Sequence, residues 1–530
     1  MPTPAHTTDI TDVIALARFA PLRLAERVLL QALRAGDIAK VSMRQPTVCN
    51  TGVGVRAPLL ARLLRSLAVL PSRRLELMGA WIEGRLDLDD AEIAGSVWFY
   101  RCTFEAPVTL ARARVSGALT FAGCRLPAVH AEGCAVERDL ALVAGCTIGR
   151  DLRLARARVD GHLDCSRLQL GGDGAHGARR SLVADAARIG GELRLGAGFT
   201  SLGEVRLVGA RIEGDVRADG HYTGHLQPGG GRGRALTLER TRIGGSLRLA
   251  GGFGAAGSTS LRRVHIGGDL DACGANFDRL GDAAWQTEPM LLLDRATIDG
   301  ALMLRRLPTP LAGASFVGTR VGTLADDEGS WGERLALDGF DYSRFADDAP
   351  LDTRFRAGWL ERQEPAHLRA QFRMQPWRRL IRVLRRMGQE HRAASIAMRR
   401  ERWLGRIGVV GAWAPPGLRW LPRLGHRLLG ALAGYGYRPA RLLVWLLAVW
   451  LACGLAYWAC APDDSAWQAM ASSLARLVPV AELPSGAPAA AGGFGAMVVR
   501  WLGHAEAAFG RAAALLLLAS LAGWTDRDRR

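Results

Sequence analysis

The feature that most constrains this 530-residue chain is an apolar residue that returns every eleven positions. The residues concerned are Ile82, Ile93, Phe104, Val115 and Leu126. Each of the first four is followed four positions later by a second apolar residue, and the repeating word is Ala-x-Ile/Val-x-Gly-x-Leu/Val. It occurs as AEIAGSV, ARVSGAL, ARVDGHL, ARIGGEL, ARIEGDV, TRIGGSL and ATIDGAL. Eleven residues is too short for a helical-hairpin repeat, so the period predicts short stacked strands.

Two eleven-residue units make a coil of about 22 residues, which is typical of a β-helix. We therefore expect a mainly β fold over residues 75–345: a single-stranded β-solenoid, resembling a right-handed β-helix. The glycine of the repeating word is expected to relax the backbone where the chain turns a corner.

Cysteines support this coil length. Cys102, Cys124 and Cys146 are 22 residues apart, and each precedes a repeat residue by two positions. Together with Cys134 they alternate with alanine at one position of the repeat, which indicates small side chains facing inward. If the coils stack, the first three cysteines form an internal ladder.

The coil length changes further along the chain. The repeat residues are Ile189, Ile212, Ile243, Ile266, Ile298 and Val321. Three of the five steps between them are 23 residues, whereas two are 31 and 32. The extra residues include 219–234 and 274–289, and insertions in a solenoid map to loops at coil corners. These loops are the first place to look for binding.

The ends of such a stack must be covered, because terminal coils expose strand edges. Residues 1–74 are expected to form a helical N-terminal cap, with amphipathic helices at Pro21–Leu33 and Val55–Leu70. At the other end, Leu335–Phe345 has the pattern of a last, atypical coil.

Residues 441–530 are expected to form a membrane region. The segment 442–461 holds twenty positions without a charge, enough to cross a hydrocarbon core of roughly 30 Å. A second span is expected at about 505–524, although Glu506 and Arg511 at its start would be costly at mid-bilayer. They could reach the interface or pair with each other. Between the spans we expect an outer loop with a short helix at Trp467–Val480.

The positive charge is concentrated beside the first span. The chain carries a formal net charge of +18, and residues 351–460 alone hold 20 arginines against five acidic residues. Lys40 is the only lysine, so the preference for arginine itself reflects a GC-rich genome. A basic block next to an apolar segment predicts a cytoplasmic membrane face. The arginines after the second span favour a cytoplasmic C-terminus as well, so the expected location is the bacterial inner membrane with both termini inside.

Residues 346–440 lose the eleven-residue period and are predicted to be a basic helical segment containing one helical hairpin. Its arginines are expected to contact anionic lipid headgroups, although a solvated face is the simpler alternative. They are Arg373, Arg378, Arg379, Arg382, Arg385, Arg386, Arg399, Arg400, Arg402 and Arg406, followed by Arg438 and Arg441 before the span. Nucleic acid is not expected as a partner, because aromatic residues are not interleaved with the basic ones.

Motifs for catalysis and metal binding are missing from the sequence. It contains no CxxC pair, no HExxH, no phosphate-binding loop and no nucleophile elbow. We therefore expect no catalytic residues, no bound cofactor and no metal, and cysteines that stay reduced in a cytoplasmic domain.

The order of these segments resembles a known group of proteins. The chain is similar to uncharacterised bacterial membrane-anchored proteins with pentapeptide-repeat-like β-solenoids. The similarity lies in words such as ARIEGDV, then QPWRRLIRVLRRMGQEHRAASIAMRRER, then GYGYRP before a span and SLARLVPVAEL after it. The similarity covers roughly residues 50–525. Relatives are sometimes labelled membrane-associated oxidoreductases, a label that no cofactor motif supports here. The words IEGDVRA and IGGDLDA also resemble bactofilins, which lack the membrane-spanning tail.

These observations favour a non-enzymatic, membrane-tethered cytoplasmic scaffold that binds a protein partner or itself through the solenoid. Two alternatives remain open. One is a channel-like or signalling protein, because a span, a short helix, a Gly-rich stretch and a second span resemble a two-span pore. The other is a membrane-associated enzyme such as an oxidoreductase.

Overall fold

A computed structural model describes residues 16–69, 72–171, 179–196, 198–225, 233–277, 289–311, 313–369, 371–460, 465–478 and 494–521. The chain divides into two compact units. The first comprises residues 1–350 and 361–373, and the second comprises 351–360 and 374–530.

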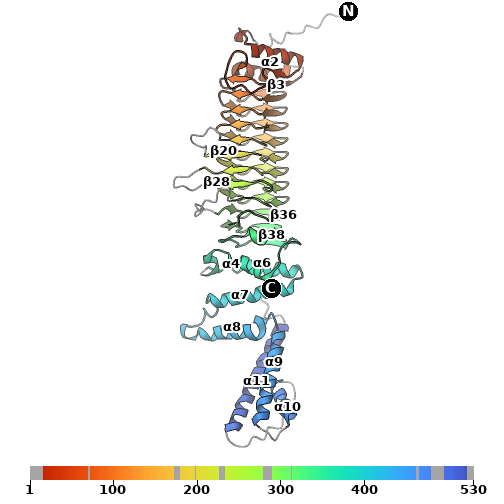
Figure 1. Cartoon of the computed structure of the whole chain (residues 1–530), viewed down its shortest axis with the longest axis vertical. Helices are drawn as coiled ribbons and strands as arrows, with labels where there is room; N and C mark the ends of the chain where they lie inside the picture. The colour runs from red at the N-terminus through yellow and green to blue at the C-terminus, as the bar shows by residue number, and fades with distance from the viewer. Residues whose placement is uncertain are drawn as a thin grey trace, which may run out of the picture. The chain divides into compact units, whose positions relative to one another are not determined.

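The first unit is a parallel β-solenoid of about eleven coils, as the sequence predicted. Each regular coil places one short strand on each of four faces, numbered here in the order in which the chain crosses them. Strands of successive coils pair side by side in parallel, and Figure 1 shows them stacked from β3 to β38.

The strands of the four faces are as follows. Face 1 holds β1 (Ala39–Lys40), β3 (Arg74–Met78), β6 (Ser96–Tyr100), β10 (Leu119–Ala122), β14 (Leu140–Val143), β18 (Leu163–Asp164), β22 (Leu193–Arg194), β26 (Val216–Arg217), β30 (Leu247–Arg248) and β34 (Leu270–Asp271). Face 2 holds β2 (Gly54–Arg56), β4 (Trp81–Glu83), β7 (Thr103–Phe104), β11 (Arg125–Leu126), β15 (Thr147–Ile148), β19 (Gln169–Leu170), β23 (Thr200–Leu202), β27 (His221–Thr223) and β31 (Gly254–Ala256). Face 3 holds β8 (Val108–Thr109), β12 (Val129–His130), β16 (Leu152–Arg153), β20 (Arg180–Val183), β24 (Glu204–Arg206), β28 (Arg234–Thr237), β32 (Ser258–Ser260), β35 (Leu291–Leu292) and β37 (Ala314–Ser315). Face 4 holds β5 (Glu92–Ile93), β9 (Arg114–Val115), β13 (Ala135–Val136), β17 (Arg158–Val159), β21 (Arg188–Ile189), β25 (Arg211–Ile212), β29 (Arg242–Ile243) and β33 (His265–Ile266). The longer strands β36 (Thr297–Leu304), β38 (Arg320–Asp326) and β39 (Asp341–Phe345) run from face 4 into face 1.

The eleven-residue period arises because the repeat residues alternate between faces 2 and 4. Ile82 pairs with Phe104 on face 2, whereas Ile93 pairs with Val115 on face 4. The register also holds across the long steps, since Ile212 pairs directly with Ile243. All six of these side chains are buried.

The three long insertions leave the solenoid at one corner. Residues 172–178 follow β19, 226–232 follow β27, and 278–288 follow the face-2 bridge of Asn276; each run precedes a face-3 strand. The predicted loop stretches 219–234 and 274–289 therefore lie around the corner between faces 2 and 3, although 219–234 also contains strand β27; residues 226–232 and 278–288 lie outside the described residues.

The role expected for the repeat glycine was wrong. At the corner between faces 4 and 1, Gly95 and Gly117 do not have left-handed backbones. Instead, a Cβ on Gly95 would lie 1.9 Å from the Arg73 carbonyl oxygen of the preceding coil, and one on Gly117 would lie 2.5 Å from the carbonyl carbon of Gly95. Glycine is favoured at these two positions because the stacked coils approach closely there, whereas Arg138 takes the same place in the next coil.

The cysteine ladder is confirmed. Cys102, Cys124 and Cys146 are buried, and each thiol lies against a carbonyl oxygen of the coil before it, at 3.5, 3.3 and 3.1 Å. All cysteines in the described residues are free. Burial raises the pKa of Cys134 to about 12, and it also raises the pKa of Cys124 far above its usual range. These thiols therefore act as small apolar side chains.

The helical cap is confirmed and extends into the sheet. Helices α2 (Leu24–Ala35) and α3 (Ala57–Arg65) bury their leucines over the first coil, after a short turn of helix η1 (Leu16–Phe19). A second short turn, η2 (Leu67–Val69), follows α3. Strand pairing begins before residue 75, because β1 pairs with β3 and β2 pairs with β4.

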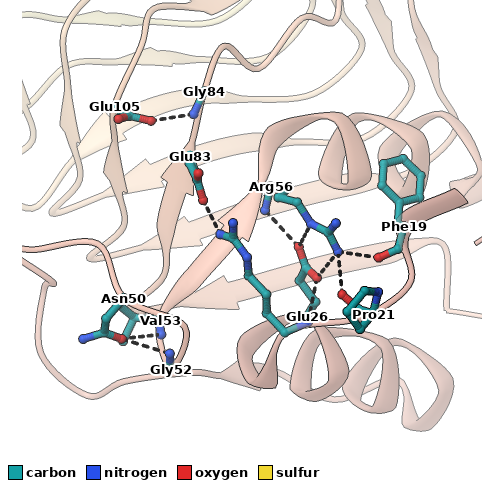
Figure 2. A network of polar contacts seen from close by, with 11 residues as sticks. Phe19, Pro21, Glu26, Asn50, Gly52, Val53, Arg56, Glu83, Gly84 and Glu105 are labelled. Carbon is teal, nitrogen blue, oxygen red and sulfur yellow. Dashed lines mark hydrogen bonds and ion pairs between the residues drawn. The ribbon is translucent and has the colours of Figure 1, made fainter.

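A buried ion pair holds the cap together (Figure 2). Glu26 is fully buried, and its carboxylate accepts hydrogen bonds from Nε and Nη2 of Arg56 at 2.7 and 2.6 Å. The backbone NH of Arg23 donates to it at 2.9 Å. Burial raises the pKa of Glu26, but these hydrogen bonds outweigh burial and leave the pKa below its ordinary value.

The last strand of the solenoid, β39, lies within the predicted final coil. After it, residues 361–373 return to the same unit: the backbone NH of Leu335 donates to the Arg362 carbonyl at 3.0 Å. The short helices η3 (Glu328–Ser330) and α5 (Pro365–Leu368) belong to this end, which covers the final coil.

The second unit is helical. It contains α4 (Thr353–Glu361, to residue 360), α6 (Gln375–Arg386), α7 (Glu390–Arg406), η4 (Pro416–Leu418), α8 (Trp420–Ala433), η5 (Gly434–Gly436), α9 (Ala440–Cys460), α10 (Ala466–Leu477) and α11 (Phe494–Leu521). Helices α6 and α7 form the expected hairpin, with Trp377, Leu380 and Ile396 in its core. Two segments, Ala440–Cys460 and Val499–Ala519, are long and apolar enough to cross a membrane.

Candidate functional site

The region with the clearest functional geometry is the group of helices α7 to α11, where the basic hairpin meets the two apolar helices. Helix α7 packs against the turn that precedes α9. Arg438 places Nη2 3.3 Å from Nε2 of His391, and Arg400 donates to the Tyr437 hydroxyl at 3.3 Å. His426 on α8 lies 3.0 Å from the Glu401 carbonyl on α7. The basic hairpin is thus fixed to the start of the first apolar helix.

Most of the predicted membrane-surface arginines are accessible. On α6, Arg378, Arg382 and Arg386 are exposed at a spacing of four, which places them on one side of the helix. Arg402, Arg406 and Arg441 are also exposed. Arg379, Arg385, Arg399 and Arg438 are partly buried.

Two of the predicted arginines do not belong to this surface. Arg400 is only 3% exposed and is held by Glu401 at 3.0 Å, so it cannot reach a headgroup. Arg373 belongs to the first unit, where its Nη1 lies 3.6 Å from Oδ2 of Asp338. Sequence spacing could not identify either one, because both are placed by residues distant in the chain.

Helix α8 is a feature that the sequence analysis passed over. Trp420, Leu421, Leu424 and Leu428 leave 46–59% of their surface exposed along one side. Arg423 and Arg427 are exposed on the same helix. An amphipathic helix with exposed Trp and Leu beside arginines is typical of a helix that lies in the membrane interface. The signal available in the sequence was the leucine spacing of three to four residues beside arginines.

The ends of the two apolar helices lie together. Leu442 near the start of α9 and Ala513 in the second half of α11 pack in one cluster with Ala433, the last residue of α8. Helices α9 and α11 are therefore antiparallel, and α8 lies at the level of their shared end.

The segment between the apolar helices contains the expected short helix, α10, but this helix packs against both apolar helices. Helix α10 runs back along α9: Nε1 of Trp450, midway along α9, donates to the Met470 carbonyl at 3.0 Å. The Ser473 hydroxyl donates to the Trp450 carbonyl at 3.1 Å. A Cβ on Gly510 would lie 2.0 Å from the Leu477 carbonyl oxygen, so the end of α10 touches the middle of α11.

The second apolar helix also begins earlier than 505, and it places Glu506 inside the bundle. Glu506 is 2% exposed; it accepts a hydrogen bond from the Tyr457 hydroxyl at 2.6 Å and one from Ser473. Arg511 is exposed, so the expected alternative of a Glu506–Arg511 pair is wrong. The Glu506 carboxylate is tolerated in an apolar helix because hydroxyl groups of α9 and α10 donate hydrogen bonds to it.

Within the described residues, no group of three or more His, Cys, Asp or Glu side chains is arranged to hold a metal ion.

Comparison with protein-family models, with curated proteins and with solved structures finds no match to this chain.

Proposed function

We propose that this protein is a membrane-tethered cytoplasmic scaffold in a bacterial inner membrane. The observation that carries the proposal is the combination of a solenoid, hydrogen-bonded through about eleven coils, with two apolar helices in the same chain. A stack of paired coils offers a long surface of fixed geometry, whereas the apolar helices supply attachment. Partners would bind the solenoid, and the arginines of α6 and α7 would contact anionic headgroups.

The orientation follows from the position of the basic residues. Exposed Arg406, Arg423 and Arg441 lie in the segment leading into the start of α9, close to where α11 ends. The positive-inside rule places that side in the cytoplasm, which would put the solenoid there too.

Membrane fractionation tests the tether. The full-length protein should stay in the membrane pellet after a carbonate wash. The paired change Leu447→Arg and Leu451→Arg alters two exposed positions of α9, each at a cost of roughly 2.5–3.5 kcal/mol at a helix centre. This variant should shift toward the wash, whereas Leu202→Arg, at an exposed solenoid position, should not. Release of the intact wild-type protein would contradict the proposal.

A second candidate function is passage of a cation through the membrane region. The packing of α10 against the middle of α9 and α11 favours it, because a short helix at that depth directs its negative C-terminal end into the bundle. Buried Glu506 would line the same region. Liposomes with the full-length protein should then show cation flux that Glu506→Gln changes; flux equal to that of empty liposomes would exclude this candidate.

A further inference from the structure

One face of the solenoid carries a row of arginines in register. Strands β17, β21, β25 and β29 of face 4 each begin with an exposed arginine, and each of the first three arginines pairs with the arginine of the next coil. The residues are Arg158, Arg188, Arg211 and Arg242, followed by His265 on β33. Paired strands lie about 4.8 Å apart, and like charges placed directly opposite destabilise a sheet. The row therefore needs an explanation beyond folding.

Acidic neighbours neutralise the row arginine in only every second coil. Arg158 pairs with Asp160 at 2.7 Å, and Arg211 pairs with Glu213 at 2.6 Å. Within the described part of the chain, no carboxylate lies within ion-pair distance of Arg188 or Arg242. Every second coil thus presents a guanidinium ready to bind an external anion.

The corner before this face carries more arginines, at positions that disfavour them. Arg156, Arg240, Arg263 and Arg295 have positive φ angles of 55–58°. At the equivalent corner, four other coils have glycine, which adopts this conformation without strain, at Gly133, Gly209, Gly318 and Gly339, whereas three have Asp90, Arg112 and Ala186 in the same conformation. A non-glycine residue there costs roughly 1–2 kcal/mol. These arginines therefore add positive charge beside face 4, at the cost of a strained backbone.

The row borders a groove on the surface of face 4. A groove of about 330 Å³ is lined by Arg158, Arg188 and Arg211 together with Asp160 and Glu213. On face 1, beyond the glycine corner, Arg194 is ion-paired with Glu192 at 2.9 Å and Arg248 with Asp215 at 3.7 Å, so these two arginines do not extend the row.

We propose that this arginine row binds a linear phosphate polymer lying along the stack of coils. Arginine matches phosphate through paired N–H groups, and guanidinium groups two strand spacings apart can each bind a separate unit of a chain that is charged along its whole length. Strands β5 to β33 of face 4 contain no Trp, Tyr or Phe, so they lack the large aromatic side chains on which the bases of a nucleic acid usually stack. Residues 1–350 carry 43 basic and 40 acidic residues, so the row is local rather than a result of overall charge. The proposal does not depend on membrane attachment.

Binding of labelled inorganic polyphosphate to the full-length protein in detergent, followed by fluorescence anisotropy at several salt concentrations, tests the proposal. The double variant Arg188→Thr/Arg242→Thr should weaken binding at least tenfold. The slope of the logarithm of the binding constant against the logarithm of the salt concentration should be shallower by roughly 0.7 for each phosphate contact that is lost. The control Arg85→Thr/Arg150→Thr removes two exposed arginines at the opposite corner and should bind like wild type.

A second variant keeps the test decisive if the first one folds poorly. Arg240→Gly/Arg263→Gly relieves backbone strain, so it should melt at or above the wild-type temperature and yet bind polyphosphate more weakly. Equal losses in the face-4 variants and the control, or wild-type binding in both face-4 variants, would overturn the proposal. Stronger binding of polyglutamate than of polyphosphate would also overturn it and would indicate an acidic protein partner.

Discussion

The buried carboxylate of Glu26 is predicted to decide whether the N-terminal cap stays closed. Glu26→Gln keeps the shape of the side chain but removes the charge that faces Arg56. The carboxylate is fully buried and accepts four hydrogen bonds, three from Arg56 and one from the backbone of Arg23. Breaking a buried pair costs roughly 3–5 kcal/mol. Because the Arg56 side chain is 28% exposed and can recover some hydration, we expect about 3 kcal/mol.

Hydrogen exchange measures this loss locally. In the full-length protein, amides of α2 and β2 should exchange roughly 100-fold faster in Glu26→Gln, since each factor of ten corresponds to about 1.4 kcal/mol. Amides of β25, far along the stack, should be unchanged. The control Glu83→Gln removes a carboxylate that is 39% exposed and bonded to Arg23, so it should cost under about 1 kcal/mol. Equal acceleration in the two variants would refute the argument from burial.

Acid should reproduce the effect of this substitution. The pKa of Glu26 is lowered in the folded protein, so its stabilisation is present above its unfolded pKa of about 4.3 and is lost as pH falls through the lower folded value. The free energy of cap opening, corrected for intrinsic exchange rates, should therefore be level near pH 6 and decline below about pH 4. Glu26→Gln should lack the part of this decline that Glu26 causes.

Three further predictions concern the coil corners, the interfacial helix and the thiols. Gly244→Ala, at the corner between faces 4 and 1, should destabilise the solenoid by about 2–3 kcal/mol in thermal unfolding, because the new Cβ meets the backbone of the preceding coil. Gly209→Ala should cost about 1 kcal/mol, because a Cβ has open space there and only the left-handed backbone is strained. A smaller effect at Gly244 than at Gly209 would contradict the close-approach argument. Leu424→Glu should weaken binding of the α8 surface to anionic lipids. In proteoliposomes, the amides of α8 should then be less protected from hydrogen exchange, and unchanged protection would count against an interfacial helix. Iodoacetamide at pH 8 should modify partly exposed Cys49 faster than Cys134, whose pKa is raised to about 12 by burial; equal rates on mass analysis would show that the coils open readily.

The sequence by itself determined the coil. Strand side chains alternate, and one buried position in each half coil must be apolar, so the spacing of Ile82, Ile93 and Phe104 is enough to predict stacked strands and their register. The apolar helix at 440–460 could be predicted equally well, because length and lack of charge are properties of the segment itself. The basic hairpin followed from helical spacing for the same reason.

Only the tertiary structure decided what neighbouring coils and helices do to one another. The corner glycine is required by a carbonyl group one coil away, and the arginine row exists only once residues separated by 23 to 31 positions come into register. Glu506 is satisfied by hydroxyl groups from two other helices, which no spacing within α11 could reveal. Local periodicity is set by the chain's own geometry, whereas close approach, pairing of charges and burial of a carboxylate depend on which segments meet.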